Sequence, residues 1–137
     1  MERTLMIVKP DAVGKNSIGQ IIARVEGEGF VVRQLQMVQL SAERAGQFYH
    51  VHHDKPFYGE LVEFMTSGPA VPMVLERDNG VAHLRDFIGP TNSEEAPAGT
   101  IRGDMGTTSM ENICHASDSV ENAAIEVRRF FDASEVH

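Results

Sequence analysis

Residues 4–13, TLMIVKPDAV, contain the clearest strand in the chain and the residue that ends it. The short apolar run with β-branched residues predicts a buried strand over residues 4–9. Pro10 stops this strand, since a central strand cannot lose a backbone donor at that position. A helix is predicted next, with one apolar face formed by Ile18, Ile21, Ile22 and Val25. Gly27 and Gly29 end that helix.

Short strands and helices continue to alternate along the rest of the chain. Further strands are predicted over residues 30–40, 70–76 and 112–114. Further helices are predicted from Ser41 onward, over 57–65, over 80–88, and after a capping box of Asp118 and Glu121. Because the helices fall between the strands without a strict βαβαβ rhythm, this order predicts an α+β sandwich, with helices on one face of a mostly antiparallel sheet.

The composition bounds what the chain can be. Its 137 residues, 42% of them hydrophobic, fit one domain over residues 1–137 with a sizeable core. No apolar run approaches the roughly 18–20 residues that span a bilayer, and residues 1–10 do not resemble a signal peptide. One cysteine cannot form an internal disulfide, which favours a cytoplasmic location. The net charge of −8, without any block of Lys and Arg, predicts no dedicated nucleic-acid surface.

Three short motifs suggest functions that their context does not support. Gly14-Lys15 lacks the upstream glycine and the following Ser or Thr of a phosphate-binding P-loop. Residues 102–104 read RGD, a tripeptide that is common by accident. The histidines of residues 50–53 lack a spaced carboxylate or cysteine partner, so a solvated surface cluster is favoured over a metal site.

The chain around His115 raises a sharper question, since this histidine stands where a strand ends and hydroxyls and carboxylates follow. By itself it is best interpreted as a buried structural histidine. Neither Ser117 nor Ser119 lies in a G-x-S-x-G elbow, so both are poor nucleophile candidates.

The long loop predicted over residues 89–106 adds a second observation, because such loops are uncommon in compact domains unless they have a function. Three of the 12 basic residues border breaks in regular structure, namely Lys9, Arg85 and Arg102. Segments 89–92 and 97–104 offer hydroxyls and free backbone amides of the kind that hold phosphates.

Four segments in order and register resemble nucleoside diphosphate kinases. They are TLMIVKPDAV (4–13), HHDKPFYGELVEFMTSGP (52–69), GPTN…AGTIRGD (89–104) and NICHASDSVENAAIE (112–126). The resemblance covers essentially the whole chain and implies one domain with a ferredoxin-like α+β sandwich. Such a sandwich has a four-stranded antiparallel sheet with helices packed mainly on one face. It also implies ping-pong transfer of the γ-phosphate, typically from ATP, to a nucleoside diphosphate, with broad base specificity.

The resemblance implies that His115 accepts the phosphoryl group, because it matches the histidine of the family motif N-x-x-H-G-S-D-S. A neutral imidazole, with an ordinary pKa of about 6.5, has a nucleophilic nitrogen at neutral pH. By resemblance, Glu126, helped by Ser119, holds the proton on the other nitrogen, and Nδ1 receives the phosphoryl group.

The family pattern also implies the nucleotide contacts. Arg85 and Arg102 would bind the phosphates and Thr91 would donate a hydroxyl. Mg²⁺ would be held through the nucleotide's phosphates and not by a protein cage. The remaining implied contacts are Lys9 at the ribose and the transferring group, Tyr49 close to Lys9, Asn112 at the sugar, and Phe57 stacking on the base.

Three residues depart from the family pattern. Ala116 replaces a glycine, Ser109 stands where many members place an apolar residue against the base, and Ser93 replaces a proline. The resemblance further implies a homo-oligomer, either a tetramer or a hexamer. Two rival functions are a nucleotide-binding regulatory module that lost the chemistry and a metal-dependent hydrolase that uses the histidines of residues 50–53.

Overall fold

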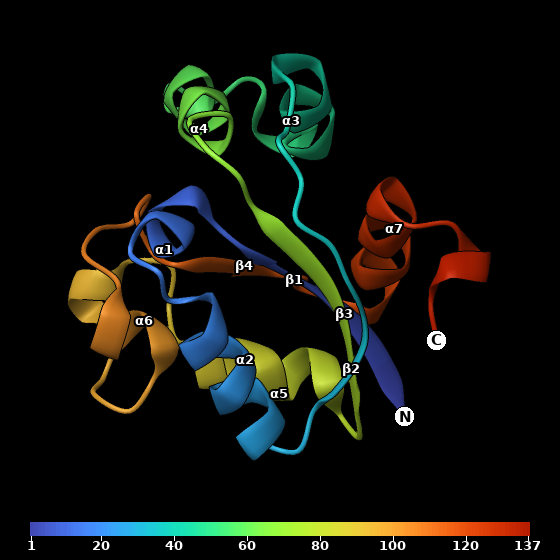
Figure 1. Cartoon of the computed structure of the whole chain (residues 1–137). Helices are drawn as coiled ribbons and strands as arrows, with labels where there is room; N and C mark the ends of the chain where they lie inside the picture. The colour runs from blue at the N-terminus through green and yellow to red at the C-terminus, as the bar shows by residue number, and fades with distance from the viewer.

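A computed structural model describes all 137 residues of the chain and contains one four-stranded sheet, which can be followed in Figure 1. Its strands, in the spatial order β2-β3-β1-β4, are β1 (Glu2–Val8), β2 (Val31–Leu35), β3 (Val71–Arg77) and β4 (Cys114–Ala116). Every pair of neighbouring strands is antiparallel. This arrangement confirms the predicted α+β class with a four-stranded antiparallel sheet.

Helices connect the strands. They are α1 (Pro10–Gly14), α2 (Ile18–Gly27), α3 (Ala42–Phe48), α4 (Tyr58–Met65), α5 (Gly80–Ile88), α6 (Ile101–Met105) and α7 (Val120–Phe130). Three short 3₁₀ turns complete the chain, η1 (His50–His52), η2 (Ser93–Glu95) and η3 (Ala133–Glu135). Every helix is too short or too polar to cross a membrane.

The central strand β1 is apolar on both of its faces. Met6 and Val8 point into a core completed by α2 and α5, whereas Leu5 and Ile7 point into a second core completed by α3, α4 and α7. All four side chains are fully buried. Successive side chains of a strand alternate between the two faces, so an all-apolar strand requires cover on both.

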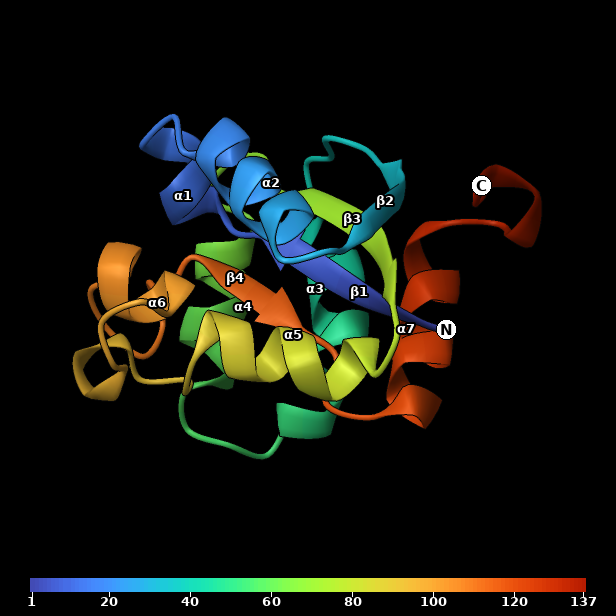
Figure 2. The ribbon, with the colours of Figure 1, turned by 90° about the horizontal axis from the view of Figure 1, so that it is seen from below.

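The helices accordingly lie on both faces of the sheet, with α3 and α4 above it and α2 and α5 below it in Figure 1. Figure 2 views the molecule from below and shows α5 running across it, whereas α7 packs with α3 and α4 on the opposite face. In this detail the structure differs from the expectation that helices gather mainly on one face. Alternation of the helices between the strands did not show on which face each would pack.

Several boundaries also differ from those predicted. Pro10 ends β1 as expected, but it also begins α1, where its missing N–H costs nothing. The predicted loop over residues 89–106 contains η2 and α6, and the hydroxyl of Thr100 caps α6 by accepting from Gly103 N over 3.0 Å. The last strand covers residues 114–116, not 112–114, and the second covers residues 31–35, not 30–40. That residues 1–137 form a single domain stays a prediction.

Candidate active site

The site is built where the end of β1 meets β4. In the register of these two strands, Ile7 lies opposite His115 and Val8 lies opposite Cys114. One residue further on, the backbone N–H of Lys9 donates to Ile113 O over 2.8 Å. The fold therefore joins two of the recognised segments that are about a hundred residues apart in the chain.

His115 has one ring nitrogen occupied and one free. Its Nε2 lies 2.8 Å from Glu126 Oε1, and because a carboxylate only accepts, Nε2 carries the proton. The hydroxyl of Ser117 donates to the same carboxylate oxygen over 2.7 Å. No protein group bonds to Nδ1, and 22% of the His115 side chain is exposed. The lone pair of Nδ1 is therefore available to a ligand.

The expectation that Ser119 supports Glu126 is corrected by this geometry. Ser119 is the N-cap of α7, and its Oγ accepts from Asn122 N over 3.0 Å. Ser117 takes the predicted role instead. Residues two apart along an extended segment point to the same side, so the side chain of Ser117 points the same way as that of His115. The predicted capping box of Asp118 and Glu121 is replaced by this Ser119 cap, one residue later.

Two aromatic rings at the end of α3 enclose the imidazole. Phe48 meets the His115 ring nearly edge-on, with centroids 5.2 Å apart, and Tyr49 does so at 6.3 Å. The hydroxyl of Tyr49 is buried without a protein partner, and burial raises the pKa of Tyr49. Burial also lowers the pKa of His115, although the Glu126 carboxylate opposes this change. The sequence predicts Phe48 on a helix but not at the site, because a helical phenylalanine is indistinguishable from ordinary core.

Arg102 contacts the start of β4, and the residue is only 5% exposed. Its Nη2 donates to Cys114 O over 2.7 Å, its Nη1 to Gly89 O over 2.9 Å, and its Nε to Asn112 O over 3.3 Å. A guanidinium has five N–H donors, so two remain for a ligand. Burial lowers the pKa of Arg102, yet the group stays charged at neutral pH.

Lys9 and Asn112 form a buried polar pair beside Arg102. Lys9 Nζ donates to Asn112 Oδ1 over 2.7 Å, and the Asn112 amide nitrogen donates to Thr91 O over 2.8 Å. Burial and the neighbouring Arg102 lower the pKa of Lys9 to about 8. Arg85 is exposed and donates to Ala116 O over 3.0 Å. Contacts thus join predicted residues from α5, the β1–α1 junction, α6 and the segment before β4 into one cluster.

Phe57, like Ser119, is a predicted residue that the structure does not join to this cluster. It lies at the start of α4 and its side chain is 41% exposed. The ring of His52 lies next to it, with centroids 5.5 Å apart. An exposed ring in this position is free to stack on a ligand.

The histidines of residues 50–53 do not converge as metal ligands would. The rings of His50 and His53 stack in parallel with centroids 4.4 Å apart. No group of three or more His, Cys, Asp or Glu side chains in the chain is arranged to hold a metal ion. The hydrolase hypothesis therefore has no supporting geometry.

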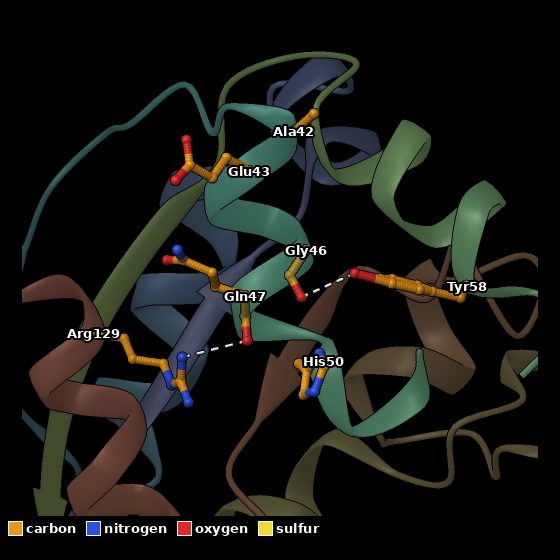
Figure 3. A pocket seen from close by; sticks show the side chains of 7 residues that line it. All are labelled: Ala42, Glu43, Gly46, Gln47, His50, Tyr58 and Arg129. Carbon is orange, nitrogen blue, oxygen red and sulfur yellow. Dashed lines mark hydrogen bonds between the residues drawn. The ribbon is translucent and has the colours of Figure 1, made fainter. Parts of the chain in front are cut away.

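A separate groove of about 510 Å³ lies along one side of α3 (Figure 3). Its lining comprises Ala42, Glu43, Gly46, Gln47, His50, Tyr58 and Arg129, and includes none of the predicted site residues. Two contacts close its sides, Tyr58 Oη to Gly46 O at 3.0 Å and Arg129 Nη1 to Gln47 O at 3.3 Å. The groove is thus distinct from the cluster around His115.

An antiparallel α+β sandwich that presents one free imidazole nitrogen close to buried cations defines a class of protein, the phosphotransferases that use a histidine nucleophile. The family model of nucleoside diphosphate kinase matches residues 2–136. The nucleoside diphosphate kinase of Chlorobium limicola is 53% identical over 136 residues, which cover 99% of this chain and 97% of that protein. That of Staphylothermus marinus is 48% identical over 135 residues, covering 98% and 96%. The chain belongs to the nucleoside diphosphate kinase family.

Solved structures agree with this assignment. The nucleoside diphosphate kinase of Aquifex aeolicus has a TM-score of 0.97 and 47% identity, covering 99% of both chains. The halophilic enzyme of Halobacterium salinarum, solved in complex with CDP, has a TM-score of 0.96 and 38% identity, covering 99% of this chain and 91% of that one. The chain is therefore a phosphotransferase that moves the γ-phosphate between nucleotides through a phosphohistidine. Enzymes of this family typically use a divalent metal.

Proposed function

We propose that His115 is the residue that carries the phosphoryl group. Its Nδ1 attacks the γ-phosphorus of a bound triphosphate, and the bond from that phosphorus to the β-γ bridging oxygen breaks, releasing the diphosphate. The terminal oxygen of a second diphosphate then attacks the phosphorus, and Nδ1 recovers its lone pair. The observation that carries this proposal is the unpaired Nδ1 on a ring that Glu126 and Ser117 hold.

The surrounding cations and hydroxyls provide the contacts for the nucleotide. We assign Arg85, the two spare N–H groups of Arg102, and the hydroxyl of Thr91 to the phosphates. Lys9 and Asn112, already bonded to each other, are assigned to the ribose and the transferring group, with Tyr49 close by. Phe57 is assigned to stacking on the base, which is worth roughly 1–3 kcal/mol and discriminates little among bases. This explains a broad base specificity.

Magnesium is proposed as the divalent ion. The charged groups of Lys9 and Arg102 act on His115 as cations, and no group of three or more His, Cys, Asp or Glu side chains is arranged to hold a metal ion. Such a site fits an ion that would be held by the phosphate oxygens of the nucleotide and would neutralise part of their charge.

A homo-oligomer, either a tetramer or a hexamer, is proposed from the edge of the sheet. Strand β2 is an edge strand, and Val31, Leu35 and Met37 on or beside it are 41%, 44% and 56% exposed. An apolar edge strand invites pairing with another chain. The mass of the protein in solution tests this proposal. We also retain the proposals of one domain over residues 1–137 and of a cytoplasmic location, the latter favoured by the single, unpaired cysteine.

Incubation with γ-labelled ATP and Mg²⁺ tests the function directly. The protein should acquire a label that is labile to acid and stable to base, and added nucleoside diphosphate should remove it. A regulatory module that only binds nucleotide would retain no label, and a hydrolase would release inorganic phosphate. Either result would contradict the proposed function.

Replacing Glu126 with glutamine should lower turnover by about 10²-fold with little change in nucleotide affinity. The amide is a poorer acceptor from Nε2–H and no longer stabilises the imidazolium, but it lies behind the ring and does not face the substrate. Single-turnover labelling and the dissociation constant for a diphosphate measure the two quantities. Unchanged turnover would count against the orienting role of Glu126.

The pH dependence of labelling should show the lowered pKa of His115. The neutral imidazole is the nucleophile, so labelling should be constant down to the ordinary pKa of about 6.5 and fall only at lower pH. In Glu126→Gln the acid limb should move lower still, because the carboxylate that raises the pKa is gone. A midpoint of the acid limb above pH 6.5 would show that the pKa of His115 is raised and not lowered.

A further inference from the structure

A strained turn lies two residues before His115. Ile113 has a φ of +78°, a left-handed conformation that is unusual for a β-branched residue. The N–H of Cys114 donates to Asn112 O over 2.9 Å, which closes a three-residue γ-turn around Ile113. Such strain persists only where neighbouring groups hold the backbone in place.

The junction of β1 and α1 provides those groups. Lys9 N donates to Ile113 O over 2.8 Å, and Asp11 Oδ2 accepts from Ile113 N over 3.1 Å. Pro10 lies between them and fixes the backbone that presents both groups. One short segment therefore satisfies both polar backbone groups of the strained residue.

The turn determines what Arg102 can contact. In an extended strand, carbonyls two residues apart are separated by about 7 Å, which is too far for one guanidinium edge to bind both. Around Ile113 the carbonyls of Asn112 and Cys114 both accept from Arg102, through Nε and Nη2. The same turn presents the side chain of Asn112 to Lys9 Nζ.

Asp11 is retained here at a cost to stability. Its Oδ1 is buried without a hydrogen-bond partner. Burial raises the pKa of Asp11, opposed by the Ile113 N–H and by Lys9. A half-buried carboxylate with one unpartnered oxygen is unfavourable, so simple packing gives no reason for it.

We propose that Asp11 is a positioning residue, which holds the γ-turn at Ile113 and, through it, the alignment of Arg102 toward the phosphates. The proposal rests on the proposed function of the His115 site. It predicts that the loss of Asp11 acts on nucleotide turnover and not on stability alone.

The first test compares three variants by kcat/KM and melting temperature. Asp11→Ala should lower kcat/KM by about tenfold or more, because Ile113 N loses a charged acceptor. Asp11→Asn, whose amide oxygen still accepts, should recover most of that loss. Asp132→Ala is the control, since it removes an exposed Asp at the N-cap of η3, and it should leave kcat/KM unchanged. Unchanged kcat/KM in Asp11→Ala would overturn the inference.

A second test isolates the turn. Ile113→Ala and Ile113→Gly both remove the buried side chain, but only glycine adopts a positive φ readily. Asp11→Ala should therefore reduce kcat/KM less in the Ile113→Gly background than in the Ile113→Ala background. Equal reductions in the two backgrounds would show that Asp11 does not act through the turn.

Two further observations keep the outcome decisive. If Asp11→Ala does not fold, hydrogen exchange at Ile113 N is measured in Asp11→Asn instead. Exchange should be several-fold faster than in the wild type, because a neutral acceptor binds this N–H more weakly. Unchanged exchange would overturn the inference. If the wild-type protein acquires no label at His115, the proposed function fails. Normal wild-type labelling with unaltered Asp11→Ala kinetics would refute the positioning role alone.

Discussion

His115→Ala should abolish labelling by γ-labelled ATP and reduce turnover by on the order of 10⁴-fold or more, because no other group can replace a missing nucleophile. Folding and nucleotide binding should be largely preserved. The imidazole contributes a partly exposed ring to the site, while Arg102, Lys9 and Asn112 retain their mutual contacts. Phosphate labelling, melting temperature and diphosphate affinity measure the three quantities.

His83→Ala is the matched control for this experiment. His83 also pairs with a glutamate, with Nε2 2.9 Å from Glu28 Oε1, and its side chain is 31% exposed. It lies on α5 and contacts Glu28 and Phe30, neither of which belongs to the candidate active site. Labelling should therefore be unaffected. Undiminished labelling in His115→Ala would refute the assignment of the phosphate carrier.

Arg102→Lys should lower kcat/KM by about 10²–10³-fold even though the charge is kept. One ammonium cannot bind the three carbonyls of residues 89, 112 and 114 and also reach phosphate oxygens. The free energy of unfolding should also fall, by about 2–4 kcal/mol, because buried carbonyls lose charged donors. Steady-state kinetics and thermal unfolding measure both effects.

Arg24→Lys provides the comparison within the same region of the fold. Arg24 pairs with Asp104 at 3.2 Å and donates to Gly99 O over 2.8 Å, so it contacts the same loop from its outer side. It should lose little activity. If the two variants had equal kcat/KM, Arg102 would have no special role at the phosphates.

The local patterns were sufficient to predict β1, β3, α2, α4 and α5, because each carries its own periodicity and stop signal. The five-residue helices α1 and α6 were missed, since one turn is too short for periodicity to show. In α6 the N-cap Thr100 was a readable signal. The start of β4 was misplaced because the left-handed backbone at Ile113 depends on Asp11, about a hundred residues away in the chain.

At the site, the sequence motifs predicted the reactive and ligand-binding side chains but not all of the residues that contact them. Ser119 was expected to support Glu126, and the structure places Ser117 there. Phe48 was not predicted at the site because its contact with His115 crosses between α3 and β4. Phe57 stays apart from the cluster, so its contact with a base remains a proposal.

The order and types of residues were enough to establish the α+β class, the family and the histidine at its centre, because several motifs stand in register along the chain. Only the tertiary structure shows that Nδ1 of His115 is free and that Arg102 binds three backbone carbonyls. It also shows that Lys9 and Asp11 hold the backbone of Ile113. Each of these features arises from contacts between segments that only folding brings together, such as Lys9 with Asn112 and His115 with Glu126. No local pattern records such contacts, since they depend on how the strands pair and which face each helix covers.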